Sequence, residues 1–172
     1  DAYKNLKKQI PHLLLTIAPR HPERFSVVEN LAKNANLKTV TRTSNQLCEN
    51  ETDVFLLDTL GELKLFYAAA DMAFVGGSLV PIGGHNVLEP AAAGVPVLFG
   101  LEMKNFAFIS TKMLAAQAAL QCENIADLET KVLQLYHQPE WRNTLTSNAK
   151  NFVAQNQGAT ERIYHLLFDP LI

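Results

Sequence analysis

The sequence predicts an α/β fold built on a doubly wound parallel sheet, and three observations support this prediction. Short apolar segments alternate along the chain with segments of helical character. The apolar segments are largely uninterrupted, as expected for strands that helices cover on both faces. A glycine-rich stretch follows one of these segments, where domains of this kind bind ligands. Together these features indicate a Rossmann-like doubly wound parallel sheet.

The expected strands are runs of apolar or β-branched residues. HLLLTIA and DVFLLD are nearly continuous apolar runs, whereas KTVTRTS alternates β-branched with polar residues. Strands are predicted over residues 12–18, 38–44, 53–58, 71–76 and 95–100. After Cys122 no further strand is indicated.

The expected helices follow from apolar spacing and from their start and stop residues. Phe25, Val28 and Leu31 keep near-helical spacing, and Pro22 suits a first turn. Gly94 and Pro139 mark a helix end and a break. Helices are predicted over residues 22–37, 61–70, 86–94, 105–120 and 124–168, with breaks at Pro139 and Gly158.

Length and composition favour one soluble domain over residues 1–172. Hydrophobic residues make up 48% of the chain, and the net charge of −2 argues against broad electrostatic binding to nucleic acid. The two cysteines, Cys48 and Cys122, form no metal-binding motif, so no metal is expected. No apolar run approaches the ~18 residues of a membrane span. Because the chain opens at Asp1, within helical sequence, we expect a piece of a longer protein.

The loops that follow the strands are the places to expect a ligand. In doubly wound domains, ligands bind at the carboxyl ends of the parallel strands. These loops cover residues 18–24, 58–63, 76–86 and 100–106. We expect all of them to open onto the same edge of the sheet.

The loop GGSLVPIGGHN contains two glycine pairs but no dinucleotide fingerprint and no P-loop. Gly83 and Gly84 precede a predicted helix start at Asn86, where free backbone N–H groups and the helix dipole favour an anion. Gly77 and Ser78, next to Gly76, offer a second set of amides. The alternative is that these glycines only make tight turns.

Two side chains beside these glycines have alternative roles. Glu89 would cap the helix with Asn86 as N-cap, or it would accept hydrogen bonds from ribose hydroxyls. His85 would donate to phosphate or carry a proton. No Ser/His/Asp set and no carboxylate pair accompanies it, which favours binding over base catalysis.

The loops after the first and third predicted strands carry further candidates. Arg20, beside Pro19, has the planar fork that binds phosphate or carboxylate, although an exposed surface arginine is the alternative. Gly61 lies at a strand-to-helix turn, with Glu62 in the first helical turn. For Glu62 the alternative is ordinary helix capping.

Several motifs resemble one known family. TIAPRHPERF, LLDTLGELKLFYAAADMAFVGGSLV, GGHNVLEPAAAGVPVLFG and the NF at 105–106 are similar, in this order, to the C-terminal half of the bacterial 3-deoxy-D-manno-octulosonic acid (Kdo) transferases. The matching motifs span most of residues 10–110. The glycine loop followed by a helix with Glu also resembles the donor-binding half of GT-B glycosyltransferases.

This resemblance implies the C-terminal, nucleotide-sugar-binding half of a GT-B fold. The implied donor is CMP-Kdo, and the implied acceptor is a lipid A precursor bound through the N-terminal half, which is absent here and would hold the catalytic carboxylate. The implied reaction is an inverting displacement without metal or other cofactor, in lipopolysaccharide biosynthesis. The implied location is the cytoplasmic face of the inner membrane, with peripheral membrane contact by the full enzyme.

The family's motifs also assign roles to residues of this chain. Gly83, Gly84, His85 and Asn86 would cradle phosphate or sugar, and Glu89 would hold the ribose. The other implied donor-site residues are Pro19 and Arg20 at the phosphate or base end, Gly61, Glu62, Gly77 and Ser78 against the donor, and Asn105 lining the cleft. Pro81 and Ile82 stand where more polar residues are expected, which weakens the implied sugar contacts.

Other interpretations of the same loops stay open. The chain would instead be half of another GT-B enzyme, a UDP-sugar transferase or a UDP-GlcNAc 2-epimerase. It would also fit a non-catalytic nucleotide-binding domain, or a scaffold whose glycines only turn the chain. By itself, the donor-binding half of a Kdo transferase is expected to transfer nothing.

Overall fold

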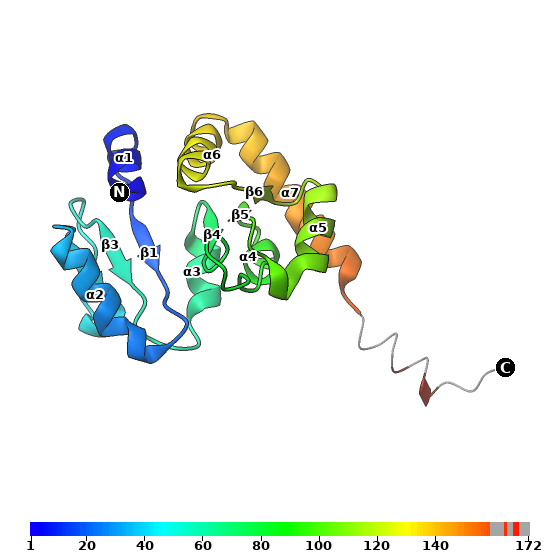
Figure 1. The fold of residues 1–172 in the computed structure, drawn as a ribbon, viewed down its shortest axis with the longest axis horizontal. Coiled ribbons are helices and arrows are strands. Elements are labelled where there is room, and N and C mark those ends of the chain that lie inside the picture. Colours follow the sequence, from blue (N-terminus) through cyan, green and yellow to red (C-terminus); the bar gives the residue numbers. More distant parts are fainter. Residues whose placement is uncertain (159–163, 165–166, 169–172) are drawn as a thin grey trace. The chain divides into compact units, whose positions relative to one another are not determined.

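The computed structural model of the chain describes residues 1–158, 164 and 167–168. It forms two compact units, Asp1–Phe66 and Tyr67–Ile172, which we call unit 1 and unit 2. Each unit contains its own three-stranded parallel sheet (Figure 1).

Unit 1 alternates helices with the strands of its sheet. Its elements are α1 (Ala2–Gln9), β1 (Leu15–Ile17), η1 (Pro22–Arg24), α2 (Phe25–Asn34), β2 (Thr39–Thr41), η2 (Arg42–Ser44) and β3 (Val54–Leu56). The strand order is β1-β3-β2, and both pairings are parallel. In the central strand, Val54 and Leu56 are buried. The carboxyl ends of the three strands therefore lie at one edge of the sheet.

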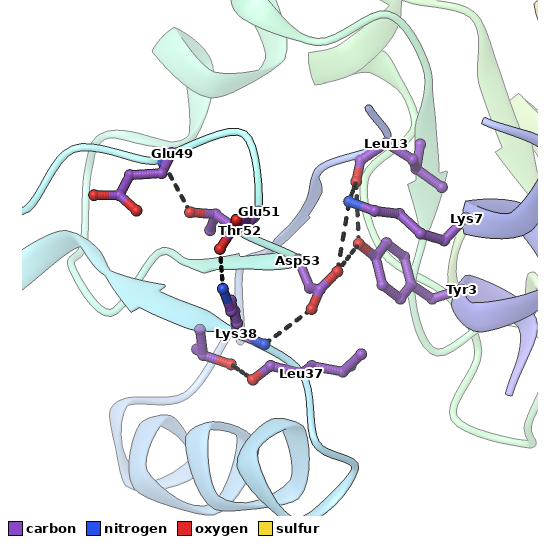
Figure 2. A network of polar contacts seen from close by, with 10 residues as sticks. Tyr3, Lys7, Leu13, Leu37, Lys38, Glu49, Glu51, Thr52 and Asp53 are labelled. Atoms are coloured by element: carbon purple, nitrogen blue, oxygen red, sulfur yellow. Dashed lines mark hydrogen bonds and ion pairs between the residues drawn. The ribbon is translucent and has the colours of Figure 1, made fainter. Parts of the chain in front are cut away.

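A polar network fastens α1 to the amino edge of this sheet (Figure 2). The Tyr3 hydroxyl donates to Oδ1 of Asp53 at 2.9 Å, and Lys7 forms an ion pair with the same oxygen at 3.4 Å. The backbone N–H of Lys38 donates to Oδ2 at 2.9 Å. Burial raises the pKa of the Asp53 carboxyl, but these donors outweigh it and the net pKa is lowered. Asp53 thus links α1, the start of β2 and the start of β3.

Unit 2 has the same alternation and a longer helical end. The helix α3 (Leu63–Ala69) spans the boundary between the units. The elements that follow are β4 (Ala73–Val75), α4 (Leu88–Ala93), β5 (Val97–Phe99), η3 (Lys104–Phe106), α5 (Ala107–Ala115), β6 (Leu120–Gln121), α6 (Ile125–His137) and α7 (Pro139–Asn156). The strand order is β4-β5-β6, again all parallel.

The central strand β5 is buried on both faces. Val97 and Phe99 point into a cluster with residues of α4, α5 and α7, such as Met113 and Phe152. Leu98, on the opposite face, packs in a second cluster with Leu135 of α6 and others. Helices on both faces of a parallel sheet confirm the predicted doubly wound α/β class.

The elements agree with the sequence predictions in type, and the main correction lies after α5. The helix predicted over 105–120 is wrong at its end: α5 ends at Ala115, and the unpredicted strand β6 follows. Gln117 takes a left-handed conformation, with φ of 50°, and its carbonyl accepts a hydrogen bond from Asn148. AAQAAL contains no Gly or Pro that would indicate this end from the sequence, and in the structure the N–H of Ala118 closes the helix on the Met113 carbonyl at 2.8 Å. The predicted break at Pro139 is confirmed.

The remaining differences concern lengths and the chain's end. The described strands are shorter than predicted, and the helix predicted from residue 22 begins as the 3-10 turn η1 before α2. The helix predicted beyond Gly158 falls mostly on residues outside the described ones. A single domain over 1–172 stays a prediction.

Candidate functional site

The glycine loop of unit 2, residues 76–87, leaves the carboxyl end of β4 and closes on itself. The N–H of Gly84 donates to the carbonyl of Gly77 at 2.9 Å. Gly77, Gly83 and Gly84 have φ values of 69°, 100° and 70°, which disfavour residues with a side chain. These glycines are therefore required by the backbone path of the loop.

The loop after β5 packs tightly against these glycines. Asn105 donates its backbone N–H to the Gly83 carbonyl at 3.0 Å and its amide Nδ2 to the Ile82 carbonyl at 3.3 Å. A Cβ on Gly83 would stand 2.6 Å from Nδ2 of Asn105, and one on Gly84 would overlap the Met103 thioether. The structure thus brings together Gly83, Gly84 and Asn105 at the carboxyl edge of the sheet of unit 2. The expectation that all four loops open onto one edge is wrong, because residues 18–24 and 58–63 follow strands of the separate sheet of unit 1.

Ser78 joins the ends of β4 and β5 from inside the protein. The residue is fully buried, at 0% exposure. Its hydroxyl donates to the Val75 carbonyl at 2.5 Å and accepts from the Gly100 N–H at 2.8 Å. A Cβ on Gly100 would overlap the Ser78 carbonyl. The Ser78 side chain thus joins the two strand ends, and the predicted contact of Ser78 with the donor stays a prediction.

The amides predicted to be free at the helix start are partly occupied. Helix α4 begins at Leu88, two residues after the predicted Asn86, and Asn86 is not its N-cap. Oδ1 of Asn86 nevertheless accepts from the Leu88 N–H at 2.9 Å, and its Nδ2 donates to Oε1 of Glu89 at 2.9 Å. The N–H groups of Gly84 and Leu88 therefore already have partners within the chain.

His85 and Glu89 lie on the same edge of unit 2 as the glycines. A Cβ built on Gly77 would stand 3.5 Å from Nε2 of His85, so the imidazole lies over this glycine. Burial raises the pKa of Tyr67, and the charge of Glu89 raises it further. Glu89 is half-buried, and its Oε1 accepts a hydrogen bond from Nδ2 of Asn86.

The carboxyl edge of unit 1 is built from charged side chains. Oε1 of Glu62 accepts from Nε and Nη2 of Arg42 at 3.2 Å and 3.0 Å. Oε2 accepts from the Thr59 hydroxyl at 2.5 Å. We call Arg42, Thr59 and Glu62 the Glu62 clamp. These bonds, led by that of Thr59, lower the pKa of the Glu62 carboxyl.

Asp58 forms a second fixed carboxylate at this edge. It accepts from the backbone N–H of Thr43 at 2.9 Å and from the Thr43 hydroxyl. Burial raises the pKa of Asp58, but the bonds from Thr43 and neighbouring amides outweigh it and lower the pKa overall. Both carboxylates thus face donors from the segment that directly follows β2.

The site residues predicted in unit 1 lie where its strands end. Arg42 lies at the same edge but was not predicted. Pro19 and the exposed Arg20 follow β1, and Gly61 and Glu62 follow β3. Gly61 has φ of 88° and open space around its Cα, so conformation alone favours glycine there. Arg42 was missed because the strand was predicted to run to residue 44, whereas β2 ends at Thr41.

The described residues offer neither a metal-binding cluster nor a membrane-spanning helix. Among residues 1–158, 164 and 167–168, no group of three or more His, Cys, Asp or Glu is placed to hold a metal ion. Within the same residues, none of the helices has the length and apolar character needed to cross a bilayer.

Comparison with known proteins connects these loops to one family. No family model matches the chain. The 3-deoxy-D-manno-octulosonic acid transferase of Haemophilus influenzae is 41% identical over 167 residues, which is 96% of this chain and 39% of that protein. The enzyme of the same name from Bordetella pertussis is 37% identical, over 92% of this chain and 37% of its own length. The chain thus spans about two fifths of these relatives.

Solved structures agree with the sequence comparison. The C-terminal CMP-Kdo binding domain of WaaA from Acinetobacter baumannii is 35% identical and superposes with a TM-score of 0.84, covering 88% of this chain and 79% of that one. Sucrose-phosphate synthase from Thermosynechococcus elongatus, at 21% identity and a TM-score of 0.61, shares the fold alone. The chain therefore belongs to the 3-deoxy-D-manno-octulosonic acid transferase family, and its fold is that of the C-terminal domain of these GT-B enzymes.

Proposed function

We propose that this chain is the donor-binding part of a Kdo transferase and holds CMP-Kdo during transfer of Kdo to a lipid A precursor. The observation that carries the proposal is its likeness, at 35% identity and a TM-score of 0.84, to a domain described as CMP-Kdo binding. The loops at the carboxyl edges of both sheets support it, because this is where ligands of parallel α/β domains bind.

The residues at these edges suit a donor that carries phosphate, sugar and base. We assign Arg20 and His85 to the negative groups of the donor, since both side chains donate hydrogen bonds. Glu89, fixed by Asn86, is a natural acceptor for ribose hydroxyls. We also assign to donor binding Pro19 and Gly61 at the edge of unit 1, and Gly77, Gly83, Gly84 and Asn105 at the edge of unit 2.

The rest of the enzyme would supply what this chain lacks. Since the chain spans 39% of its Haemophilus relative, we assign the acceptor site and the catalytic carboxylate to the other part of the enzyme. In the proposed reaction, that carboxylate deprotonates an acceptor hydroxyl, which attacks the anomeric carbon of Kdo and displaces CMP. Arg20 would stabilise the charge on the departing phosphate. The whole enzyme would work at the cytoplasmic face of the inner membrane.

Titration of the 172-residue chain with CMP and with UMP tests the proposal. We expect amide NMR shifts for CMP at Gly61, Gly77, Gly84 and Glu89, with a weaker response to UMP. Equal or stronger binding of UMP would instead favour a UDP-sugar enzyme of the same fold. If neither nucleotide shifts any signal, the same titration on the full-length enzyme decides whether the loops bind nucleotide at all.

A further inference from the structure

We propose that Arg42 and Thr59 are positioning residues that hold Glu62 as the acceptor for the 4-amino group of a cytosine base. The Glu62 clamp would then select a cytidine nucleotide over a uridine nucleotide. This inference rests on the proposed function, because it takes a CMP nucleotide as the ligand. Neither Arg42 nor Thr59 was singled out by the sequence.

The location of the Glu62 clamp follows from the sheet of unit 1. Arg42 begins η2 directly after β2, and Thr59 and Glu62 follow β3, the strand that pairs with β2. Because the two strands are parallel, their carboxyl ends are neighbours, and the Arg42 side chain needs only to cross from one to the other. The clamp thus stands at the edge where parallel α/β domains bind ligands.

The hydrogen bonds of the clamp fix both the position and the charge of the carboxylate. The three hydrogen bonds of the clamp are all donated to Glu62, two by the Arg42 guanidinium and one by the Thr59 hydroxyl. Arg42 is itself fixed, since its Nη1 donates to Oδ1 of Asn45 at 3.2 Å. An ionised carboxylate can only accept hydrogen bonds, so whatever binds here must donate.

The clamp leaves accepting capacity on the carboxylate. A carboxylate oxygen offers about two lone-pair sites. Oε1 receives two donors from Arg42, whereas Oε2 receives one from Thr59. The Glu62 side chain is 28% exposed, so solvent reaches this group. One further donor from a ligand can therefore be accepted at Oε2.

Among the groups of CMP, the base amine fits this acceptor best. The phosphate carries no donor at neutral pH and is repelled by a carboxylate. Ribose hydroxyls are donors, but they are the same in CMP and UMP. Cytosine presents an amine at position 4, whereas uracil presents a carbonyl oxygen that a carboxylate repels. An acceptor-only group at this position therefore discriminates by attraction and by repulsion together.

The test compares CMP and UMP affinities across matched variants of the 172-residue chain, measured by calorimetry. The isosteric Glu62→Gln removes the charge, and its amide can donate to uracil. Arg42→Met removes the guanidinium group, with both its charge and its two N–H donors. Arg42→Lys keeps the positive charge but not the paired donors, and Thr59→Val removes the hydroxyl. Glu51→Gln is the control, since Glu51 is also ion-paired, with Lys38, but precedes β3.

We expect the preference for CMP over UMP to fall about tenfold in Glu62→Gln, the usual size of one charge-assisted hydrogen bond. Arg42→Met and Thr59→Val should lose part of the preference, and Arg42→Lys should recover some of what Arg42→Met loses. Glu51→Gln should leave the ratio unchanged. A residue with only a structural role would weaken both nucleotides alike and would not move this ratio.

Two outcomes would overturn the inference about the Glu62 clamp. One of them leaves the proposed function intact, and the other overturns it as well. If Glu62→Gln keeps the CMP preference, or weakens CMP and UMP equally, the clamp does not read the base, while the proposed function stands. If the unaltered chain prefers UMP, or if neither it nor the full-length enzyme binds CMP, both the inference and the proposed function fail.

Discussion

At the carboxyl edge of unit 1 polar side chains hold one another, whereas at the carboxyl edge of unit 2 backbone and glycine set the structure. In unit 1, Arg42, Thr59 and Glu62 form the Glu62 clamp, and Thr43 fixes Asp58. In unit 2, Gly84 bonds Gly77 and the strand ends meet through Ser78. The edges of two three-stranded parallel sheets thus depend on different physical forces, electrostatic in one and steric in the other.

The largest expected effect tests the steric side of this comparison. In Gly100→Ala, the new methyl group would overlap the Ser78 carbonyl, which is backbone and cannot move aside cheaply. We expect a loss of about 3 kcal/mol in the free energy of unfolding, measured by urea denaturation. Gly76→Ala is the matched control, since nothing lies within 4 Å of a Cβ there. Equal costs in both variants would contradict the steric explanation.

The next effect tests the Ser78 side chain, which joins the ends of β4 and β5 at the edge of unit 2. Ser78→Ala leaves the buried N–H of Gly100 without its acceptor, and we expect a cost of about 2 kcal/mol. Ser110→Ala is the control: that hydroxyl is also buried, but it only donates to the Ala107 carbonyl within its own helix. Thermal unfolding of both variants measures the difference. A Ser78→Ala variant as stable as Ser110→Ala would show that the bridge between β4 and β5 is dispensable.

The smallest expected effect is a dependence of stability on pH, which should be seen for a substitution at the edge of unit 1 but not for one at the edge of unit 2. Asp58→Asn should cost about 1 kcal/mol at pH 7, since Asp58 accepts from Thr43 at the surface. The pKa of Asp58 is lowered in the folded state, so its contribution is present above about pH 4 and is lost as pH falls below that. The stability gap between the unaltered chain and Asp58→Asn should therefore narrow from pH 5 to pH 2.5.

The gap for Ser78→Ala serves as the reference in the same pH series. Neither a hydroxyl nor a backbone N–H titrates in this range, so that gap should stay constant while the Asp58 gap narrows. A parallel decline of both gaps would mean that acid weakens the chain as a whole. The electrostatic description of unit 1 would then be wrong.

The sequence predicted where the glycine loop lies but not what its glycines do in the structure. Paired glycines after an apolar run identify a loop at a strand end, and the structure places Gly83 and Gly84 there. Which amides stay open depends on contacts made from far along the chain. The loop after β5 supplies Gly100, Met103 and Asn105. No local sequence pattern predicts that these residues pack against the glycine loop.

The side-chain cluster of unit 1 was only half predictable. Glu62 stood out because it follows a strand, whereas Arg42 was hidden inside an overlong predicted strand. β-Branched residues continue past Thr41, so composition gives no stop signal, and the change to η2 coincides with the bonds between Thr43 and Asp58. The ion pair of Arg42 with Glu62 can be predicted only when the parallel pairing of β2 with β3 is known.

The closed path of the glycine loop has a consequence for any ligand that reaches it. The bond from Gly84 to Gly77 and the two bonds from Asn105 hold the loop in one arrangement before anything binds. A flexible loop loses conformational entropy on binding, at about 1–2 kcal/mol for each residue whose backbone becomes fixed. Here that loss has already occurred during folding, so more of the contact energy with a ligand remains as affinity.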